Sequence, residues 1–236
     1  MSEHQDFDIN ALAAYLHLTP AQVQRMADRG RLPGRKIAGQ WRFAQADIHH
    51  WFESQIGASD SAELIGVEEM LQRQKSAPAN QVRIADLLPI ELIAIPLEAR
   101  TKNSAIDSIC QLAAHSGKLW DAPGMTEAIR NRESLHPTAL ENGVALLHPR
   151  RPMPNLIGES FLALGITSKG IPFGGPRGSL TDIFFLIASY DEAIHLRILA
   201  RLSRLIVEPN FIEALRSADH AQTTWKIVAA AEDKIP

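Results

Sequence analysis

The sequence is short of cysteine and of long apolar runs. Its single cysteine, Cys110, excludes an internal disulfide framework. A membrane-spanning helix needs roughly 18–20 consecutive apolar residues, and no stretch of the chain approaches that length. Residues 1–8 are polar and acidic, so they do not have the apolar core of a secretory signal peptide. We therefore expect a cytoplasmic protein that does not insert into a membrane.

Common cofactor motifs are missing as well. The chain has neither a G-x-x-x-x-G-K-[ST] loop nor a G-x-G-x-x-G loop, and no His, Cys and Asp residues at zinc-site spacing. His49 and His50 are adjacent on an expected helix and point to different faces, so we interpret them as surface residues. We expect no cofactor and no metal. The composition, 45% hydrophobic and 22% charged over 236 residues, is ordinary for globular protein and allows two small domains.

Residues 1–56 have the pattern of a small helix-turn-helix domain with a β-wing. Apolar side chains at helical spacing predict a first helix near residues 9–16. A second helix is expected after Thr19-Pro20, an N-cap followed by proline at the first helical position, and it ends at Gly30. Strands at residues 35–37 and 41–43 predict a hairpin. A third helix should follow with three apolar side chains, Ile48, Trp51 and Phe52.

Positive charge is concentrated in this domain. Although the net charge is −3, the segment from Arg25 to Arg42 holds six basic residues and one acid, Asp28. Such a surface suits a polyanion. The segment also resembles the excisionase/MerR-like winged helix-turn-helix family, whose motif is matched at residues 29–30, 32–33, 36–37, 39 and 41–43.

That resemblance implies DNA binding, with two sets of contacts. The groove-side residues would be Gln22, Gln24, Arg25 and Arg29. The phosphate contacts would be Arg35, Lys36 and Arg42. One module this small buries little surface, so we expect a homodimer. The alternative is a solvated basic face that contacts another protein.

Residues 57–80 read as a linker, because small polar residues flank a short stretch of helical periodicity. Residues 81–236 then alternate helical and strand patterns, which predicts an α/β domain with a mixed sheet of four or five strands flanked by helices. Strands are expected at residues 90–95, 144–147, 159–166 and 183–189, with a turn-rich loop at residues 170–178. Ser189 and Glu192 have the spacing of a capping box. Cys110 lies in an apolar helical stripe and should be part of the core.

The most informative stretch runs from residue 132 to residue 151. A short apolar strand ends at His148, and Pro149 then turns the chain away. This places one imidazole at the lip of a strand, with an unperturbed pKa of ~6.5 that makes it a competent nucleophile near neutral pH. Arg150 and Arg151 follow at once and can hold an anionic group.

This stretch resembles the phosphoacceptor segment of type 2 enzyme IIA domains of the bacterial phosphotransferase system, which include fructose, mannitol and nitrogen-regulatory members. The matching positions are Arg132-Glu133, Pro137-Thr138, Asn142-Gly143-Val144-Ala145 and His148. The chain departs from the family at Leu146-Leu147, where Ile-Pro is usual, and at His136.

The resemblance implies roles for four residues in phosphotransfer. His148 would be phosphorylated by a histidine-containing phosphocarrier protein, and His195, in the string H-L-R-I-L-A-R-L, would lie beside it. Arg132 and Thr138 would bind the phosphoryl oxygens. Arg150 and Arg151 are expected to bind the same group, because of their charge and their position after His148.

Together, the two halves indicate a cytoplasmic regulator that couples phosphorelay to DNA binding. Two alternatives stay open. One is a catalytically degenerate enzyme IIA-like domain that senses an anion or a partner, and the other is a sugar-uptake component whose N-terminal module binds protein.

Overall fold

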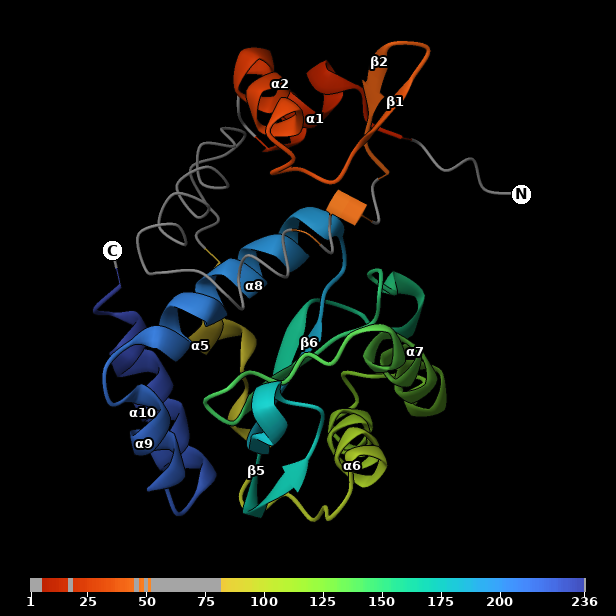
Figure 1. Cartoon of the computed structure of the whole chain (residues 1–236). Helices are drawn as coiled ribbons and strands as arrows, with labels where there is room; N and C mark the ends of the chain where they lie inside the picture. Colours follow the sequence, from red (N-terminus) through yellow and green to blue (C-terminus); the bar gives the residue numbers. More distant parts are fainter. Residues whose placement is uncertain (1–5, 17–18, 45–46, 49–50, 52–81, 236) are drawn as a thin grey trace. The chain divides into compact units, whose positions relative to one another are not determined.

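The computed structural model describes residues 6–16, 19–44, 47–48, 51 and 82–235 (Figure 1). The chain divides into two compact units, Met1–Gln81 and Val82–Pro236. Within the described parts of both units, no helix is long and apolar enough to cross a membrane. The predicted linker at residues 57–80 lies outside the described residues.

The N-terminal unit begins with the two predicted helices, α1 (Ile9–Leu16) and α2 (Pro20–Asp28). Thr19 and Gln22 cap α2 reciprocally: the Gln22 amide nitrogen donates to Thr19 Oγ1 over 3.3 Å, and the Thr19 amide nitrogen donates to Gln22 Oε1 over 2.8 Å. The buried side chains of the unit form a small apolar centre that includes Leu12, Val23, Ala27, Leu32, Phe43 and Ile48.

The wing consists of β1 (Arg35–Ile37) and β2 (Gln40–Arg42), paired antiparallel. Its turn has only two residues, Ala38 and Gly39, with φ angles of 50° and 78°. Two consecutive left-handed residues match the twist of a tight hairpin, so β2 begins at Gln40, one residue earlier than predicted. Of the third predicted helix, residues 47, 48 and 51 are described and are helical, whereas Phe52 lies outside the described residues.

A mixed four-stranded sheet forms the centre of the C-terminal unit, as predicted (Figure 1). In sheet order its strands are β3 (Ile93–Ala94), β5 (Phe161–Pro172), β6 (Leu180–Ala188) and β4 (Val144–Leu147). The pairs β3–β5 and β4–β6 are parallel, whereas β5 and β6 are antiparallel. The carboxyl ends of β4 and β6 therefore meet at one edge of the sheet.

Several predicted bounds need correction, including that of β6, which begins at Leu180, three residues earlier than predicted. The first half of the strand expected at residues 90–95 is a 3₁₀ helix, Ile90–Leu92, because the chain turns after Pro89 and the Leu92 amide nitrogen donates to the Pro89 carbonyl over 2.9 Å. Only Ile93–Ala94 of the predicted stretch is a strand. The loop expected at residues 170–178 begins three residues later than predicted, at Phe173. After a register shift, β5 resumes its pairing with Ile171 opposite Thr181 and ends at Pro172.

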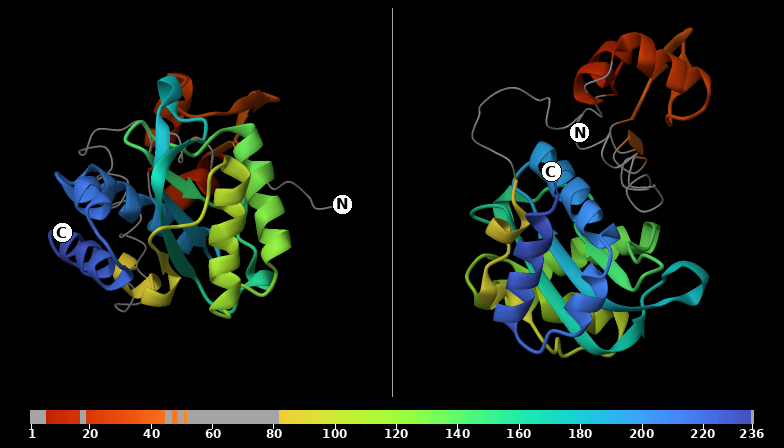
Figure 2. Two further views of the ribbon diagram at one scale, coloured as in Figure 1. Left: turned by 90° about the horizontal axis from the view of Figure 1, so that it is seen from below. Right: turned by 90° about the vertical axis from the view of Figure 1, so that its left-hand side faces the viewer.

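Helices cover both faces of the sheet (Figures 1 and 2). On one face lie α6 (Lys102–His115) and α7 (Ala122–Leu135), over a core that includes Ala145, Leu147 and Phe184. The other face is covered by α5 (Ile84–Leu87), α8 (Glu192–Val207), α9 (Phe211–Arg216) and α10 (Ala221–Glu232).

Cys110 belongs to α6 and is fully buried in the core, as predicted. Burial raises the pKa of its thiol to about 11, because the thiolate would lose its hydration there. The thiol is therefore a packing group.

The predicted capping box of Ser189 and Glu192 is wrong. The N-cap of α8 is Asp191, whose Oδ1 accepts a hydrogen bond from the Ile194 amide nitrogen over 2.8 Å. Pairing in β6 continues to Ala188, which leaves Ser189 at the end of the strand rather than at the start of a helix. The Ser189 hydroxyl has a different partner, described below.

Candidate functional site

His148 follows the last residue of β4, and its ring orientation is fixed by the strand itself. Its Nδ1 lies 2.8 Å from the carbonyl oxygen of Leu146. A carbonyl only accepts hydrogen bonds, so the proton of the neutral imidazole must be on Nδ1. The lone pair is then on Nε2, which is the nitrogen able to act as a nucleophile. We expected a surface imidazole, but the side chain is buried: only 2% of His148 is exposed.

His195 lies beside His148, as expected from the family string. It is the fourth residue of α8, it is 5% exposed, and the two ring centroids are 5.0 Å apart with an interplanar angle of 57°. The contact exists because residues of β4 alternate between the two faces of the sheet. The His148 side chain lies on the same face of the sheet as Leu146, opposite the α6–α7 core. That face is covered by α8.

Ser189 is a candidate site residue that the sequence analysis missed. Its Oγ lies 3.0 Å from Nδ1 of His195, and its side chain is buried. Because β4 and β6 are parallel neighbours, the residues that follow them, His148 and Ser189, lie at the same edge of the sheet. A polar residue directly after a buried strand is the signal that could have identified it.

Arg132 and Thr138 are tied to the turn that precedes β4. Arg132 is 7% exposed, and its Nη1 donates to the carbonyl oxygen of His136 over 2.6 Å. The amide nitrogen of Thr138 donates to Glu133 Oε1 over 3.1 Å, and the Thr138 hydroxyl donates to the same carboxylate. The segment then runs back along β4, with the Leu146 amide nitrogen 3.5 Å from the Thr138 carbonyl oxygen.

Arg150 and Arg151 are exposed, whereas the two imidazoles are buried. Among the described residues, no hydrogen bond, ion pair or ring contact joins either guanidinium to His148 or His195. Their part in binding phosphate therefore stays a prediction. The described residues also contain no group of three or more His, Cys, Asp or Glu side chains placed to hold a metal ion.

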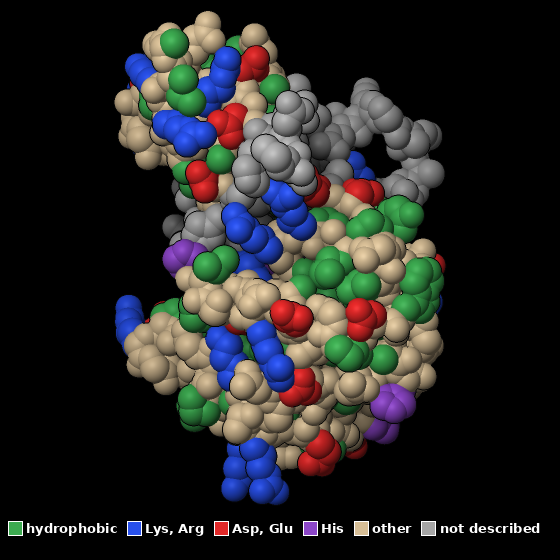
Figure 3. Space-filling model, turned by 90° about the vertical axis from the view of Figure 1, so that its right-hand side faces the viewer, with side chains coloured by type: hydrophobic (Ala, Val, Ile, Leu, Met, Phe, Trp, Pro, Cys, Tyr) green, Lys and Arg blue, Asp and Glu red, His purple; other side chains and the backbone are tan. Residues whose placement is uncertain are grey.

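The predicted DNA contacts lie on α2 and the wing. Gln22, Arg25 and Arg29 are exposed, as are Arg35 and Lys36, whereas Arg42 is half-buried. The Gln22 amide is already used to cap α2, which reduces its availability to bases. On this unit, Lys and Arg side chains are interspersed with acidic ones (Figure 3).

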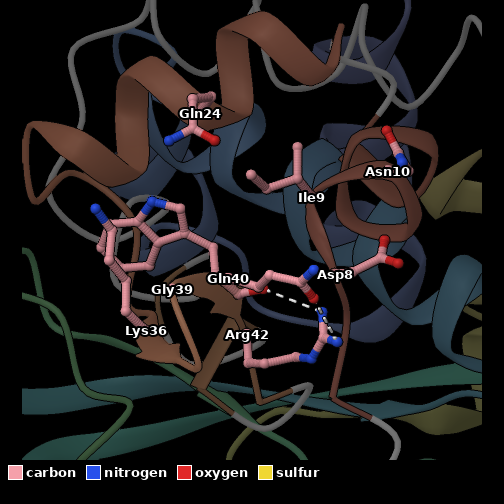
Figure 4. A pocket seen from close by; sticks show the side chains of 9 residues that line it. Asp8, Ile9, Asn10, Gln24, Lys36, Gly39, Gln40 and Arg42 are labelled. Atoms are coloured by element: carbon pink, nitrogen blue, oxygen red, sulfur yellow. Dashed lines mark hydrogen bonds between the residues drawn. The ribbon is translucent and has the colours of Figure 1, made fainter.

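Asp28 connects α2 to the wing. Its carboxylate accepts hydrogen bonds from Gln24 Nε2 over 2.9 Å and from Trp41 Nε1 over 3.2 Å, and Lys36 Nζ lies 3.8 Å away. These contacts, with the hydrogen bond from Gln24 as the largest cause, lower the pKa of Asp28 below its usual value. Beside this contact is a polar hollow of about 360 Å³, whose lining includes Asp8, Gln24, Lys36, Trp41 and Arg42 (Figure 4).

The fold and the paired imidazoles define the class of protein. The chain belongs to the family described as "Phosphoenolpyruvate-dependent sugar phosphotransferase system, EIIA 2", which matches residues 86–231. A second family, described as "Helix-turn-helix domain", matches residues 7–56. The excisionase-like assignment is finer than this match and stays a prediction.

Curated relatives are similar to the C-terminal unit. The nitrogen regulatory protein of Bradyrhizobium diazoefficiens is 30% identical over 150 residues, which cover 62% of this chain and 94% of that protein. The fructose-specific EIIABC component of Bacillus subtilis is 29% identical over 149 residues, 62% of this chain, but the match spans only 23% of that relative.

Solved structures share the fold of the C-terminal unit. The crystal structure of the nitrogen regulatory protein IIA-Ntr from Neisseria meningitidis is similar with a TM-score of 0.55 and 22% identity, covering 61% of this chain and 98% of that one. IIA mannitol from Escherichia coli is similar with a TM-score of 0.53 and 20% identity, covering 59% and 97%.

Proposed function

We propose that Nε2 of His148 accepts a phosphoryl group from a histidine-containing phosphocarrier protein. The Nε2 lone pair attacks phosphorus, the new N–P bond forms, and the N–P bond to the donor imidazole breaks. The donor nitrogen leaves with the electron pair of that bond. The observation that carries the proposal is the hydrogen bond from His148 Nδ1 to Leu146, because it reserves the lone pair for Nε2.

His195 is proposed to stabilise the transferred group. A serine hydroxyl that donates to Nδ1 leaves the proton of neutral His195 on Nε2. That proton can then be donated to a phosphoryl oxygen. The ring lies in the first turn of α8, where the helix dipole also favours negative charge. Arg132 and Thr138 are proposed to bind the remaining oxygens, with Arg150 and Arg151 attracting the incoming donor.

We also propose that phosphorylation regulates DNA binding by the N-terminal domain (residues 1–56) in a cytoplasmic homodimer. A phosphoryl group adds a charge of about −1.5 to −2 at neutral pH. That change would act through the linker at residues 57–80 on a module that binds DNA through α2 and its wing. The matches to the EIIA 2 family and to a helix-turn-helix domain support both halves of this proposal.

One observation favours a second candidate, a degenerate domain that binds a partner without phosphotransfer. His148 is 2% exposed, so little of the residue is accessible to a donor. A site that stays closed would bind a partner but would not take up phosphate.

The test is the intact mass of the full chain after incubation with phosphoenolpyruvate, the general phosphotransferase and the phosphocarrier protein. We expect a gain of one phosphoryl group that is lost in His148→Ala and kept in His136→Ala, a matched change at an exposed histidine. No gain, or a gain that survives His148→Ala, would favour the degenerate domain.

A further inference from the structure

Glu133 is a buried carboxylate with an unusual set of partners. Its side chain is only 1% exposed. Its Oε1 accepts from the amide and the hydroxyl of Thr138, and its Oε2 lies 2.9 Å from Lys102 Nζ. A buried carboxylate costs several kcal/mol unless it is paired and hydrogen-bonded. Lys102 supplies the only full positive charge among these three contacts.

The position of Lys102 is not explained by the stability of its own helix. It is the first residue of α6, where the helix dipole disfavours a cation. The ammonium group nevertheless makes three contacts. Besides Glu133, it donates to the Phe173 carbonyl oxygen over 3.3 Å and lies 4.7 Å from the centroid of the Phe173 ring.

Lys102 is linked to His148 through a continuous set of contacts. Glu133 binds Thr138, and the Thr138 carbonyl accepts from the Leu146 amide nitrogen. The Leu146 carbonyl in turn accepts from Nδ1 of His148. The same turn also packs against the β5–β6 connection, where a Cβ added to Gly174 would lie 2.8 Å from Pro137.

We propose that Lys102 is a positioning residue of the phosphoryl site, acting through Glu133. This inference rests on the proposed function. Both hydrogen-bond donors of Thr138 are engaged by Glu133 in this structure. When a phosphoryl group arrives on His148, the Thr138 hydroxyl transfers its hydrogen bond from Glu133 to a phosphoryl oxygen. Lys102 keeps the carboxylate neutralised during that exchange, so the turn stays in place.

The first test is amide hydrogen exchange of the full chain, which does not require phosphotransfer. In Lys102→Met we expect the Thr138 amide to exchange about tenfold faster, while the Ala145 and Leu147 amides in β4 are unchanged. Lys102→Arg should restore protection. Lys118→Met is the matched control, because it removes a lysine that is ion-paired with the exposed Glu159. Unchanged exchange at Thr138 would overturn the proposal.

The second test is the rate of His148 phosphorylation at saturating phosphocarrier protein. We expect Lys102→Met to lower this rate about tenfold with the KM for the donor unchanged, since positioning affects the chemical step. Faster Thr138 exchange without a slower rate would overturn the link to phosphotransfer. A wild-type chain that takes up no phosphate would refute the proposed function, while the exchange experiment still decides whether Lys102 holds the turn.

If Lys102→Met raises exchange throughout the C-terminal unit, the variant has unfolded, and Lys102→Met combined with Glu133→Gln replaces it. The double variant removes the buried charge that lacks a counter-ion. The amide introduced by Glu133→Gln is neutral and can still accept from Thr138, so the proposal predicts a phosphorylation rate close to that of the wild type in the double variant. A rate lowered about tenfold would overturn the claim that Lys102 acts by neutralising Glu133.

Discussion

Ser189 Oγ lies 3.0 Å from Nδ1 of His195, so the residue that follows β6 sets the orientation of an imidazole in the first turn of α8. Both side chains are buried, which makes the hydrogen bond difficult to replace with water. The contact ties the sheet edge to the helix at the point where His148 also lies. It therefore fixes which nitrogen of His195 faces the proposed phosphoryl group.

Ser189→Ala should lower the phosphorylation rate about tenfold, because His195 loses the partner that we propose keeps its proton on Nε2. The free energy of unfolding should fall by ~1–2 kcal/mol. Imidazole nitrogen chemical shifts will show whether the tautomer changes. Ser203→Ala is the matched control: this buried serine donates to the Leu199 carbonyl in the same helix, and its loss should leave the rate intact. Equal rates for wild type and Ser189→Ala would contradict the assigned role.

Gly143→Ala should destabilise the turn before β4 by about 2–4 kcal/mol. Its φ is 88°, and an added Cβ would lie 2.6 Å from Arg216 Nη2 and 2.8 Å from Asp182 Oδ1. Arg216 and Asp182 form a two-bond ion pair that cannot easily move. Gly117→Ala separates the strain of a positive φ from the crowding of the added Cβ. Gly117 has a φ of 77°, but a Cβ added there would have nothing within 4 Å, so this substitution should cost only about 1 kcal/mol. Thermal unfolding measures the stability of both variants. Similar losses of stability would show that the added Cβ in Gly143→Ala is not crowded.

Lys36→Ala should weaken DNA binding and make it less sensitive to salt. Lys36 is exposed on β1, where the wing is expected to contact phosphates. Loss of one phosphate contact should reduce the slope of log K against log salt by about 1. Lys226→Ala removes an exposed lysine from α10 in the C-terminal unit and is the control. An equal loss in both variants, or no salt-sensitive binding by the wild type, would favour a protein-binding module instead.

The wing should loosen in acid. The contacts from Gln24 and Trp41 lower the folded-state pKa of Asp28, so they stabilise the folded domain at pH values above the unfolded pKa of about 3.8. That stabilisation is lost as the pH falls through the lower folded-state pKa. The Trp41 indole N–H resonance should therefore shift below pH 3.8 in the wild type. In Asp28→Asn it should not titrate, and a titration that persists there would assign the shift to another group.

The sequence predicted the elements that depend on local pattern. The strand at residues 144–147, the Thr19 cap and the burial of Cys110 all follow from periodicity and capping chemistry, and the structure confirms them. The family string also placed His195 next to His148, and the two rings are in contact.

Features that depend on tertiary contacts were not predictable in the same way. The burial of His148 depends on the covering of its sheet face by other segments, which strand periodicity does not report. Ser189 was assigned to a helix cap because its spacing from Glu192 fits that motif. In the structure, β6 pairing continues to Ala188 and Asp191 caps α8, so Ser189 does not cap the helix. The Lys102–Glu133 pair joins two helices, and no local pattern links those positions.

The central claim is that Nε2 of His148 is the phosphoacceptor. Phosphorus–nitrogen coupling in the NMR spectrum of the fully phosphorylated, nitrogen-labelled chain tests it most directly. We predict one phosphorus nucleus coupled to Nε2 of His148, with the proton on Nδ1 retained by its hydrogen bond to Leu146. Coupling to Nδ1, coupling to another histidine, or a chain that takes up no phosphate would contradict the account.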